Sequence, residues 1–404
     1  MAMNGKNGRD VVILGSARTP QGKFLGALSS LSASEIGQVA VKAAVERSGI
    51  NAGDVNEVLL GNVVSAGTGQ ALPRQISINA GVPDTVGGIT VNKVCGSGLK
   101  TVMLASSMVK AGDGELFIAG GVESMSNAPY LNDSVRKGNK YGHIQLRDSL
   151  QNDGLWCSLC DWGMGNAAEF IGKQLEVSRE EMDEFAYHSH RKAAEATAAG
   201  RFKAEIAPVT IQTRKGEIII DSDEPIRPDT TIEALSKLRP AFEADGNVTA
   251  GNAPGMNDGA AALIVGSRAY AEKNGHAPVA RIVGYGQAAV EPAWIFYAPV
   301  KAIPIALERA GWTMDDVDLF EINEAFASQV LADRNGLERD GYHLPMEKVN
   351  VNGGAIAIGH PLGASGARVL VTLIHALQDR GLKRGLAALC LGGAEAVAMA
   401  VELE

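Results

Sequence analysis

The sequence predicts an α/β protein whose mostly parallel β-sheet is covered by helices on both faces. Three observations lead to this fold class. Strand and helix patterns alternate along the first part of the chain and again after about residue 273. The chain has 48 glycines and only 5% aromatic residues, a composition that suits closely packed α/β layers. A segment near the start also recurs in the last third of the chain, which indicates a duplicated domain.

The first part alternates between strands and helices. Apolar runs bounded by turn residues predict the strands, and helical spacing that ends at a glycine predicts the helices. Residues 91–112 combine both patterns, with an extended run, a glycine-rich turn and a helix that has an apolar face. The other strands are expected over 10–20, 56–64 and 115–126, and the other helices over 31–49 and 72–82.

The chain becomes more polar and less periodic between residues 127 and 248. This segment contains a predicted helix over 178–200, which begins with a Ser–Glu capping box, and a predicted strand pair over 206–220. We interpret it as an inserted, lid-like loop domain. A glycine-rich turn and an apolar strand over 249–267 then return to the earlier pattern.

Residues 43–55 align with residues 305–317 without a gap. The shared residues are Glu46 and Glu308, Arg47 and Arg309, Gly49 and Gly311, Asp54 and Asp316, and Val55 and Val317. A strand and then a glycine-rich turn follow in both copies. We therefore expect two pseudo-equivalent halves that face each other. The expected boundaries are 1–126 plus 249–272 for the N-terminal half, 127–248 for the loop domain and 273–404 for the C-terminal half.

Charge and cysteine content exclude several classes of protein. The net charge of −9 argues against a non-specific nucleic-acid binder and against a basic membrane-binding surface. Four cysteines in 404 residues do not make a disulfide framework. The polar start, MAMNGKNGRD, has no apolar signal core, and no apolar run is long enough to span a bilayer. We expect a cytoplasmic protein with no nucleic-acid or membrane partner.

Cys95 lies at the turn between the predicted strand and helix of residues 91–112. The partial positive charge and free N–H groups at a helix start favour thiolate over thiol, so this cysteine is a candidate nucleophile. Two alternatives remain. Free cysteines are often simply buried, and strand–glycine turn–helix units also bind phosphates without a catalytic cysteine.

The duplication places a second glycine-rich turn, which carries His360, opposite the turn of Cys95. A cysteine–histidine pair is a common way to activate a thiol nucleophile, although a histidine alone in a loop is more often structural. Cys390 precedes the glycines of a third turn beside both. Its apolar neighbours suit a buried strand, but a second thiol could also donate and accept a proton.

Other polar residues carry weaker signals. Asn323 follows a predicted strand, and its amide could hold a water molecule or an oxyanion, or could cap a helix. Cys157 and Cys160 form a single CxxC pair, which is weak evidence for a redox or metal role. His188 and His190 are expected on a solvated helix face.

Six motifs, in order along nearly the whole chain, resemble the thiolase family of acetyl-CoA C-acyltransferases. They are VNKVCGSG, GGVESMSNAPY, KLRPAF with TAGNAPGMNDGAAALIV, EINEAFA, NGGAIAIGHPLGASGARVL and the CLGG near the end. The resemblance implies a duplicated five-layered α-β-α-β-α core with a loop domain over the active site. It also implies a homodimer or homotetramer that acts on acyl-CoA and CoA. It implies no metal and no organic cofactor, because coenzyme A is a substrate.

The resemblance also implies a role for each candidate residue. Cys95 would accept the acyl group, and His360 would activate it. Cys390 would take a proton from the α-carbon of the second acyl-CoA or return it in thiolysis. Asn323 would hold a water molecule that, with His360, stabilises the thioester enolate. The backbone N–H groups of Cys95 and Gly392 would bind the oxyanion of the tetrahedral adduct.

Three residues are expected to bind substrate. By resemblance, Met164 and Phe326 lie in the acyl pocket. Pro254 stands where most family members have a serine whose hydroxyl helps to bind the pantetheine arm of CoA. Because proline has neither a hydroxyl nor a backbone N–H, we expect altered or weaker CoA contacts there.

The last motif also departs from the family pattern, since it reads CLGGAEA where family members usually have CxGGGxG. A carboxylate at Glu395 close to Cys390 would raise the pKa of that thiol. Alternatively, Glu395 points away and pairs elsewhere, which we consider the better interpretation.

The leading functional hypothesis is an acetyl-CoA acetyltransferase that condenses acetyl-CoA or cleaves acetoacetyl-CoA, in fatty acid metabolism. One alternative is a degradative 3-ketoacyl-CoA thiolase of broader chain length. Another is a non-thiolytic subunit of an acyltransferase complex. A decarboxylating or polyketide-type condensing enzyme on the same fold is less consistent with the sequence, because those enzymes lack a second catalytic cysteine like Cys390.

Overall fold

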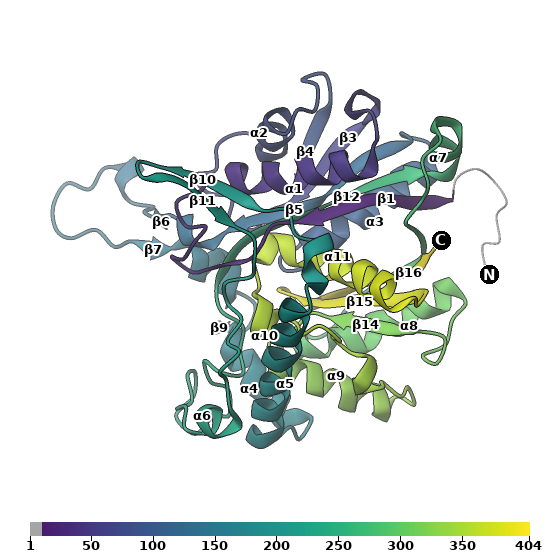
Figure 1. Ribbon diagram of the computed structural model, residues 1–404. Helices are drawn as coiled ribbons and strands as arrows, with labels where there is room; N and C mark the ends of the chain where they lie inside the picture. The colour runs from purple at the N-terminus through teal and green to yellow at the C-terminus, as the bar shows by residue number, and fades with distance from the viewer. Residues whose placement is uncertain (1–9) are drawn as a thin grey trace.

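The computed structural model describes residues 10–404 (Figure 1). The polar start of the chain falls almost entirely on residues 1–9 and lies outside the described residues. Between residues 10 and 404, no helix has both the length and the apolar character needed to cross a lipid bilayer.

The strands of the N-terminal half follow the order β1-β12-β5-β3-β4. β5, β3 and β4 are parallel, whereas β12 is antiparallel to both of its neighbours, β1 and β5. The short strand β2 pairs with β12. The bounds are β1 Val11–Arg18, β2 Gly22–Lys23, β3 Glu57–Gly61, β4 Gly87–Val91, β5 Leu116–Ser124 and β12 Asn257–Ser267.

The strands of the C-terminal half repeat this arrangement in the order β13-β16-β15-β14. β16 is antiparallel to β13 and β15, and β14 is parallel to β15. β1 and β13 pair at Val12–Arg281 and Ile13–Ala280, so the two halves form one continuous ten-stranded sheet. The bounds are β13 Ala280–Ala289, β14 Leu319–Ile322, β15 Arg384–Leu391 and β16 Glu395–Leu403.

The prediction of a mostly parallel sheet is therefore wrong, because the sheet contains both parallel and antiparallel strand pairs. Strands β15 and β16 are joined by a turn of only three residues, and so short a connection forces an antiparallel hairpin. In the N-terminal half, β12 also runs antiparallel to β5, and the insert joins these two strands. Apolar buried strands look alike in sequence whichever way they run, so the pattern of strands did not reveal these reversals.

The helices complete five layers (Figure 1). Helix α1 (Ala33–Ser48) covers one face of the N-terminal strands, and α8 (Ala298–Ala310) covers the outer face of the C-terminal strands. Between the two sets of strands lie α3 (Ser97–Ala111) and α11 (Leu362–Arg380), which pack against each other. This is the α-β-α-β-α order expected from the resemblance. The outer layers also contain α2 (Leu72–Asn79), α7 (Arg268–Asn274) and α9 (Ala327–Arg339).

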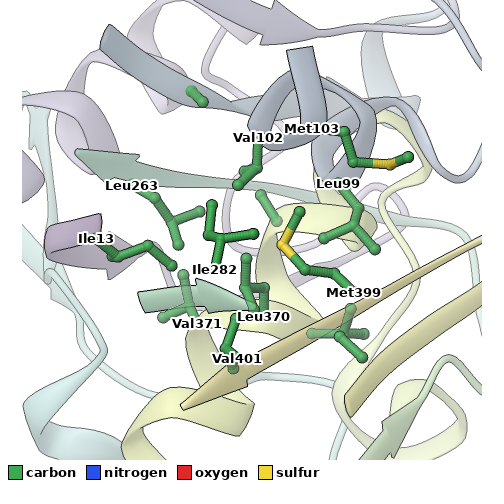
Figure 2. Packing of buried hydrophobic residues seen from close by; sticks show 14 of the residues in the cluster. Ile13, Leu99, Val102, Met103, Leu263, Ile282, Leu370, Val371, Met399 and Val401 are labelled. Atoms are coloured by element: carbon green, nitrogen blue, oxygen red, sulfur yellow. The ribbon is translucent and has the colours of Figure 1, made fainter. Parts of the chain in front are cut away.

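The main core forms around the two central helices. Leu99 and Val102 of α3 meet Leu370 and Val371 of α11, and side chains from the strands of both halves close around them (Figure 2). All but a few residues of α11 are buried. The central layer thus holds the two halves, and the turns that precede both helices, in a fixed relation.

The internal repeat has a local structural reason. Helix α1 ends at Gly49 and α8 ends at Gly311, and both glycines have the left-handed conformation with φ of 66° and 71°. A residue with a Cβ is strained in this conformation, so each half keeps a glycine at the end of its first long helix.

The insert contains the predicted helix and the predicted strand pair, together with a second long helix and two short hairpins that the sequence did not predict. Helix α5 begins with the predicted capping box of Ser178 and Glu181. His190 on this helix is buried, and its ring accepts a hydrogen bond from the backbone N–H of Arg227. The prediction that His190 lies on a solvated helix face is therefore wrong. The bounds are β6 Tyr130–Leu131, β7 Arg147–Asp148, β8 Trp156–Cys157, β9 Trp162–Gly163, α4 Met164–Gln174, α5 Arg179–Ala198, β10 Val209–Thr213, β11 Gly216–Ile220 and α6 Ile232–Ser236.

Candidate active site

A cavity of about 500 Å³ lies where turns of both halves meet the insert. Every residue predicted to act on substrate, except Asn323, lines it. These residues are Cys95, Met164, Pro254, Phe326, His360, Cys390 and Gly392. The cavity thus brings together chemistry-bearing residues that are up to 297 positions apart in the sequence, as the duplication argument predicts.

The turn of Cys95 is pressed against the C-terminal half. A Cβ at Gly96 would lie 2.2 Å from Leu391 Cδ2, and a Cβ at Gly98 would lie 2.6 Å from the backbone nitrogen of Ala367. Ser97 fixes the turn, since its hydroxyl donates to the carbonyl of Val94 at 2.6 Å and accepts from the Lys93 N–H at 2.8 Å. The glycines beside Cys95 therefore allow a close approach of the two halves.

The resting thiol of Cys95 is protonated. Burial raises its pKa to about 11, although the backbone N–H groups of Gly392 and Cys95 favour the thiolate. Glu123 adds to the increase. The predicted net decrease in this pKa is wrong, because loss of solvation outweighs the backbone N–H groups that favour the thiolate. A base must remove the proton before Cys95 can attack.

His360 is held as a neutral base. Burial and the charge of Arg368 lower its pKa to about 3. Its Nδ1 lies 2.6 Å from the hydroxyl of Ser365, and that hydroxyl donates its single hydrogen to the carbonyl of Pro361 at 2.9 Å. With its hydrogen on Pro361, the Ser365 hydroxyl accepts from Nδ1–H, and we assign His360 this tautomer, in which Nε2 carries the lone pair. Sequence reasoning missed Ser365, although it lies within the GHPLGASG motif.

Substitution of Ser365 by alanine is expected to lower kcat about 10- to 100-fold with little change in the KM for acyl-CoA. Without the serine acceptor, the Nδ1–H tautomer loses its stabilising hydrogen bond, and Nε2 no longer faces the cavity as a fixed base. Steady-state kinetics of Ser365→Ala would measure this. Ser106→Ala is the matched control, because Ser106 is equally buried but its hydroxyl has no hydrogen-bond partner within residues 10–404. Equal kcat values for the two variants would contradict the assigned tautomer.

Glu123 ties the His360 turn to the N-terminal half. Its buried carboxylate accepts from the backbone N–H groups of Val63, Val64 and Gly363 at 3.0, 3.1 and 2.8 Å. Burial raises its pKa to about 7 despite these donors. Sequence reasoning gave Glu123 no role. A charged residue near the end of an otherwise apolar strand, in the GGVESMS motif, was the available signal.

Cys390 lies at the end of β15 and is almost fully buried. Burial, Cys95 and Asp333 raise its pKa well above that of an ordinary thiol. The neighbouring carboxyl of Asp333 is itself buried, with its pKa also raised by burial, and accepts a hydrogen bond from the amide of Gln329. Cys390 therefore rests as a protonated thiol, the form that can donate a proton.

Asn323 does not cap a helix, because α9 begins four residues later at Ala327 after an N-cap at Phe326. Its side chain is fully buried, and within residues 10–404 neither its amide oxygen nor its amide nitrogen has a hydrogen-bond partner. The capping alternative is therefore wrong. An orphaned buried amide fits a group that binds water.

Glu324, next in the chain, has the opposite environment to Asn323. Its carboxylate accepts from the hydroxyl of Ser189, the amide of Asn350 and the backbone N–H of Ile356 at 2.7, 2.9 and 3.0 Å. It thereby joins the insert to the loop that leads into His360. The EINEA motif thus places a residue that stabilises the site beside one whose side-chain amide has no hydrogen-bond partner within residues 10–404.

Aromatic side chains line one side of the cavity. Phe326 packs edge-on against Phe242 and Phe296, with ring centroids 6.2 and 5.5 Å apart. Sequence reasoning missed both of these neighbours, since Phe242 ends the KLRPAF motif but was given no role, and Phe296 lies in no motif. Gly165 has a reason to be glycine, since a Cβ there would lie 2.2 Å from the ring of Phe242.

Glu395 forms an ion pair with Lys93. The groups that raise the pKa of Cys390 are its burial, Cys95 and Asp333. The interpretation that Glu395 pairs away from Cys390 is therefore the correct one. The pair also connects the turn of Cys95 to the turn that follows Cys390.

Two matched α/β halves that bring a nucleophilic thiol, a neutral histidine and a second thiol into one cavity define an enzyme of the cysteine-dependent acyltransferase class. Residues 11–269 match the model of the thiolase N-terminal domain, and residues 276–403 match that of the thiolase C-terminal domain. The chain belongs to the thiolase family.

Full-length relatives agree with this assignment. The acetyl-CoA acetyltransferase of Cupriavidus necator is 49% identical over 97% of this chain and 99% of that protein. The acetyl-CoA acetyltransferase of Escherichia coli is 49% identical over 98% of this chain and 99% of its own length. The crystal structure of the acetyl-CoA acetyltransferase of Bacillus anthracis superposes with a TM-score of 0.94 at 42% identity, covering 98% of this chain and 99% of that chain.

Proposed function

We propose that this protein is an acetyl-CoA acetyltransferase that cleaves acetoacetyl-CoA with CoA and also runs the reverse condensation. The observation that carries the proposal is the meeting of Cys95, His360 and Cys390 in one cavity. The names of the full-length relatives support the same activity. Acyl-CoA and CoA are the proposed substrates.

In the proposed thiolysis, Nε2 of His360 takes the proton of Cys95, and the sulfur attacks the ketone carbon of the substrate. The backbone N–H groups of Cys95 and Gly392 stabilise the oxyanion, a role supported by their position beside the Cys95 sulfur. The carbon–carbon bond breaks, and the departing thioester enolate takes a proton from Cys390. A water molecule held by Asn323, together with His360, stabilises that enolate. The CoA thiol then gives its proton to the Cys390 thiolate and attacks the acetyl group, so that acetyl-CoA forms as the carbon–sulfur bond to Cys95 breaks. The released Cys95 thiolate takes back the proton held by His360, which restores the starting enzyme.

The test measures CoA-dependent thiolysis of acetoacetyl-CoA by the decrease in the absorbance of its enolate. A longer 3-oxoacyl-CoA is assayed in parallel as a second substrate. We expect cleavage of the short substrate with the higher kcat/KM and no cleavage by Cys95→Ala. Faster cleavage of the longer substrate would instead support a degradative thiolase of broader chain length. No cleavage of either by the pure protein would contradict the proposal and favour a complex subunit.

Replacement of Pro254 by serine is expected to lower the KM for acyl-CoA several-fold. Serine restores a hydroxyl and a backbone N–H to the cavity wall, and one net hydrogen bond contributes about 1 kcal/mol. The KM of Pro254→Ser, with Pro83→Ser as a control on an exposed loop, measures the effect. An unchanged KM would mean that Pro254 does not weaken CoA binding.

We further propose a homodimer or homotetramer in a cytoplasmic setting, with the division into two halves and a loop domain given above. Strand β4 supports assembly, since it is the exposed edge of the large sheet. The long loop between β6 and β7 also extends away from the body and exposes apolar side chains such as Tyr141 and Leu146 (Figure 1). A monomeric mass by light scattering would contradict this.

A further inference from the structure

The hairpin of β8 and β9 carries two cysteines that the proposed reaction does not use. Trp156 pairs with Gly163 and Cys157 pairs with Trp162. The Asp161 N–H donates to the carbonyl of Cys157 at 2.8 Å, which closes one helical turn at the tip of the hairpin. Residues three apart in such a turn lie on the same side, so Cys157 and Cys160 point the same way.

The two thiols are in contact and both are free. Cys157 is buried, whereas Cys160 is partly exposed beside the exposed Leu159. Within residues 10–404, no three histidine, cysteine or acidic side chains are arranged to hold a metal ion, so the pair is not half of a metal site. A disulfide needs the sulfurs to close to about 2.05 Å, which a surface turn can accommodate by a small shift.

The hairpin forms a wall of the catalytic cavity. Trp156 lines that cavity and also a second cavity of about 520 Å³ that Cys157 lines. Gly392, whose N–H faces Cys95, lines both cavities as well. Trp156 therefore connects the turn at Cys157 to the cavity that holds Cys95, His360 and Cys390.

We propose that Cys157 and Cys160 form a reversible intramolecular disulfide that weakens CoA binding in the adjacent cavity. The oxidant is a low-molecular-weight disulfide such as oxidised glutathione. The accessible Cys160 thiolate attacks one sulfur of the oxidant and releases one thiol. The Cys157 thiolate then displaces the second. The two cysteines together lose two electrons and two protons, and the oxidant is reduced to two thiols.

The reaction requires a thiolate, and burial together with the neighbouring Cys157 raises the pKa of Cys160. Exchange is therefore slow at neutral pH and faster in mild alkali. We expect Cys157 and Cys160 to become oxidised when the surrounding thiol–disulfide balance changes for a long time, and not when it changes briefly.

The test uses Cys95→Ala protein, so that the cavity nucleophile does not react, incubated with oxidised glutathione at pH 8. Remaining thiols are blocked with a maleimide and mapped by mass spectrometry. We expect the peptide with Cys157 and Cys160 to carry no maleimide and to be two hydrogens lighter. The Kd for CoA, measured by calorimetry, should rise at least threefold and return after reduction.

The matched control adds Cys160→Ser to the same protein, and its Kd for CoA should not respond to the oxidant. Full maleimide labelling of both cysteines after oxidation would overturn the proposal, and so would a disulfide that leaves the Kd for CoA unchanged. The inference takes CoA as the ligand from the proposed function. Thiol mapping and CoA binding do not depend on turnover, so a failure of the proposed activity would be seen separately.

Discussion

Replacement of Cys390 by alanine is expected to lower thiolysis of acetoacetyl-CoA by about 10²- to 10⁴-fold, the usual contribution of general acid–base catalysis. In the proposed mechanism the departing enolate is a strong base that must be protonated inside the cavity. The thiol of Cys390 lines that cavity and is the proposed proton donor. Without this thiol the carbon–carbon bond cannot break at a useful rate.

The same variant should still accept an acetyl group. Transfer from acetyl-CoA to Cys95 needs His360 and the backbone N–H groups but no proton at carbon. Exchange of labelled CoA into acetyl-CoA measures this half-reaction, and we expect Cys390→Ala to retain it within a few-fold. An equal loss of exchange and thiolysis would show that Cys390 acts on acylation instead.

The raised pKa of Cys390 also sets a pH dependence. A thiol with its ordinary pKa near 8.5 would lose its proton, and its function as an acid, as the pH rises from 7 to 9. Because burial raises the pKa of Cys390 well above this range, the proton stays in place. We expect single-turnover cleavage to hold steady up to pH 9, whereas a fall centred near pH 8.5 would contradict the assignment.

Replacement of Asn323 by alanine is expected to lower kcat by about 10²- to 10³-fold, the loss typical when one oxyanion donor is removed. The substitution breaks no hydrogen bond within residues 10–404, because the side chain of Asn323 makes none there. The free energy of unfolding should therefore change far less than the activity. Steady-state kinetics and denaturant unfolding of the same variant measure both quantities.

Asn350→Ala is the matched control for the expected loss of activity without loss of stability. Its equally buried amide bonds the backbone of Ile322 twice, at 2.8 Å each, and Glu324 at 2.9 Å. Asn350→Ala leaves those groups unpaired, at a cost of about 1–3 kcal/mol for each buried group. If Asn323→Ala proves as unstable as Asn350→Ala, the side chain has a structural role and the water-binding assignment is wrong.

Local patterns predicted the elements and the residues that meet in the cavity. The capping box of Ser178 and Glu181 and the helix ends at Gly49 and Gly311 follow from rules that operate within a few residues. The internal repeat then placed His360 opposite Cys95. The glycine-rich turn of Cys95 was also predicted, although the reason for Gly96 and Gly98 in it is the close contact with Leu391 and Ala367.

What the sequence could not predict depends on surroundings that only the folded chain supplies. Strand direction depends on the connections, so the reversal at β16 was missed. The pKa of Cys95 depends on how dry its cavity is, and burial reversed the expected shift. Asn323 looked like a helix cap until the start of α9 was known. Ser365 and Glu123 act through hydrogen bonds to turns, which no spacing in the sequence indicates.

The most direct test of the central claim, that Cys95 carries the acyl group, is to mix the protein with acetyl-CoA, quench in acid and locate the acetyl group by peptide mass spectrometry. We expect one acetyl group on Cys95 in the wild type and in Cys390→Ala, and none in Cys95→Ala. An acetyl group on Cys390, or turnover of acetoacetyl-CoA with no acetyl group on any cysteine, would contradict the account.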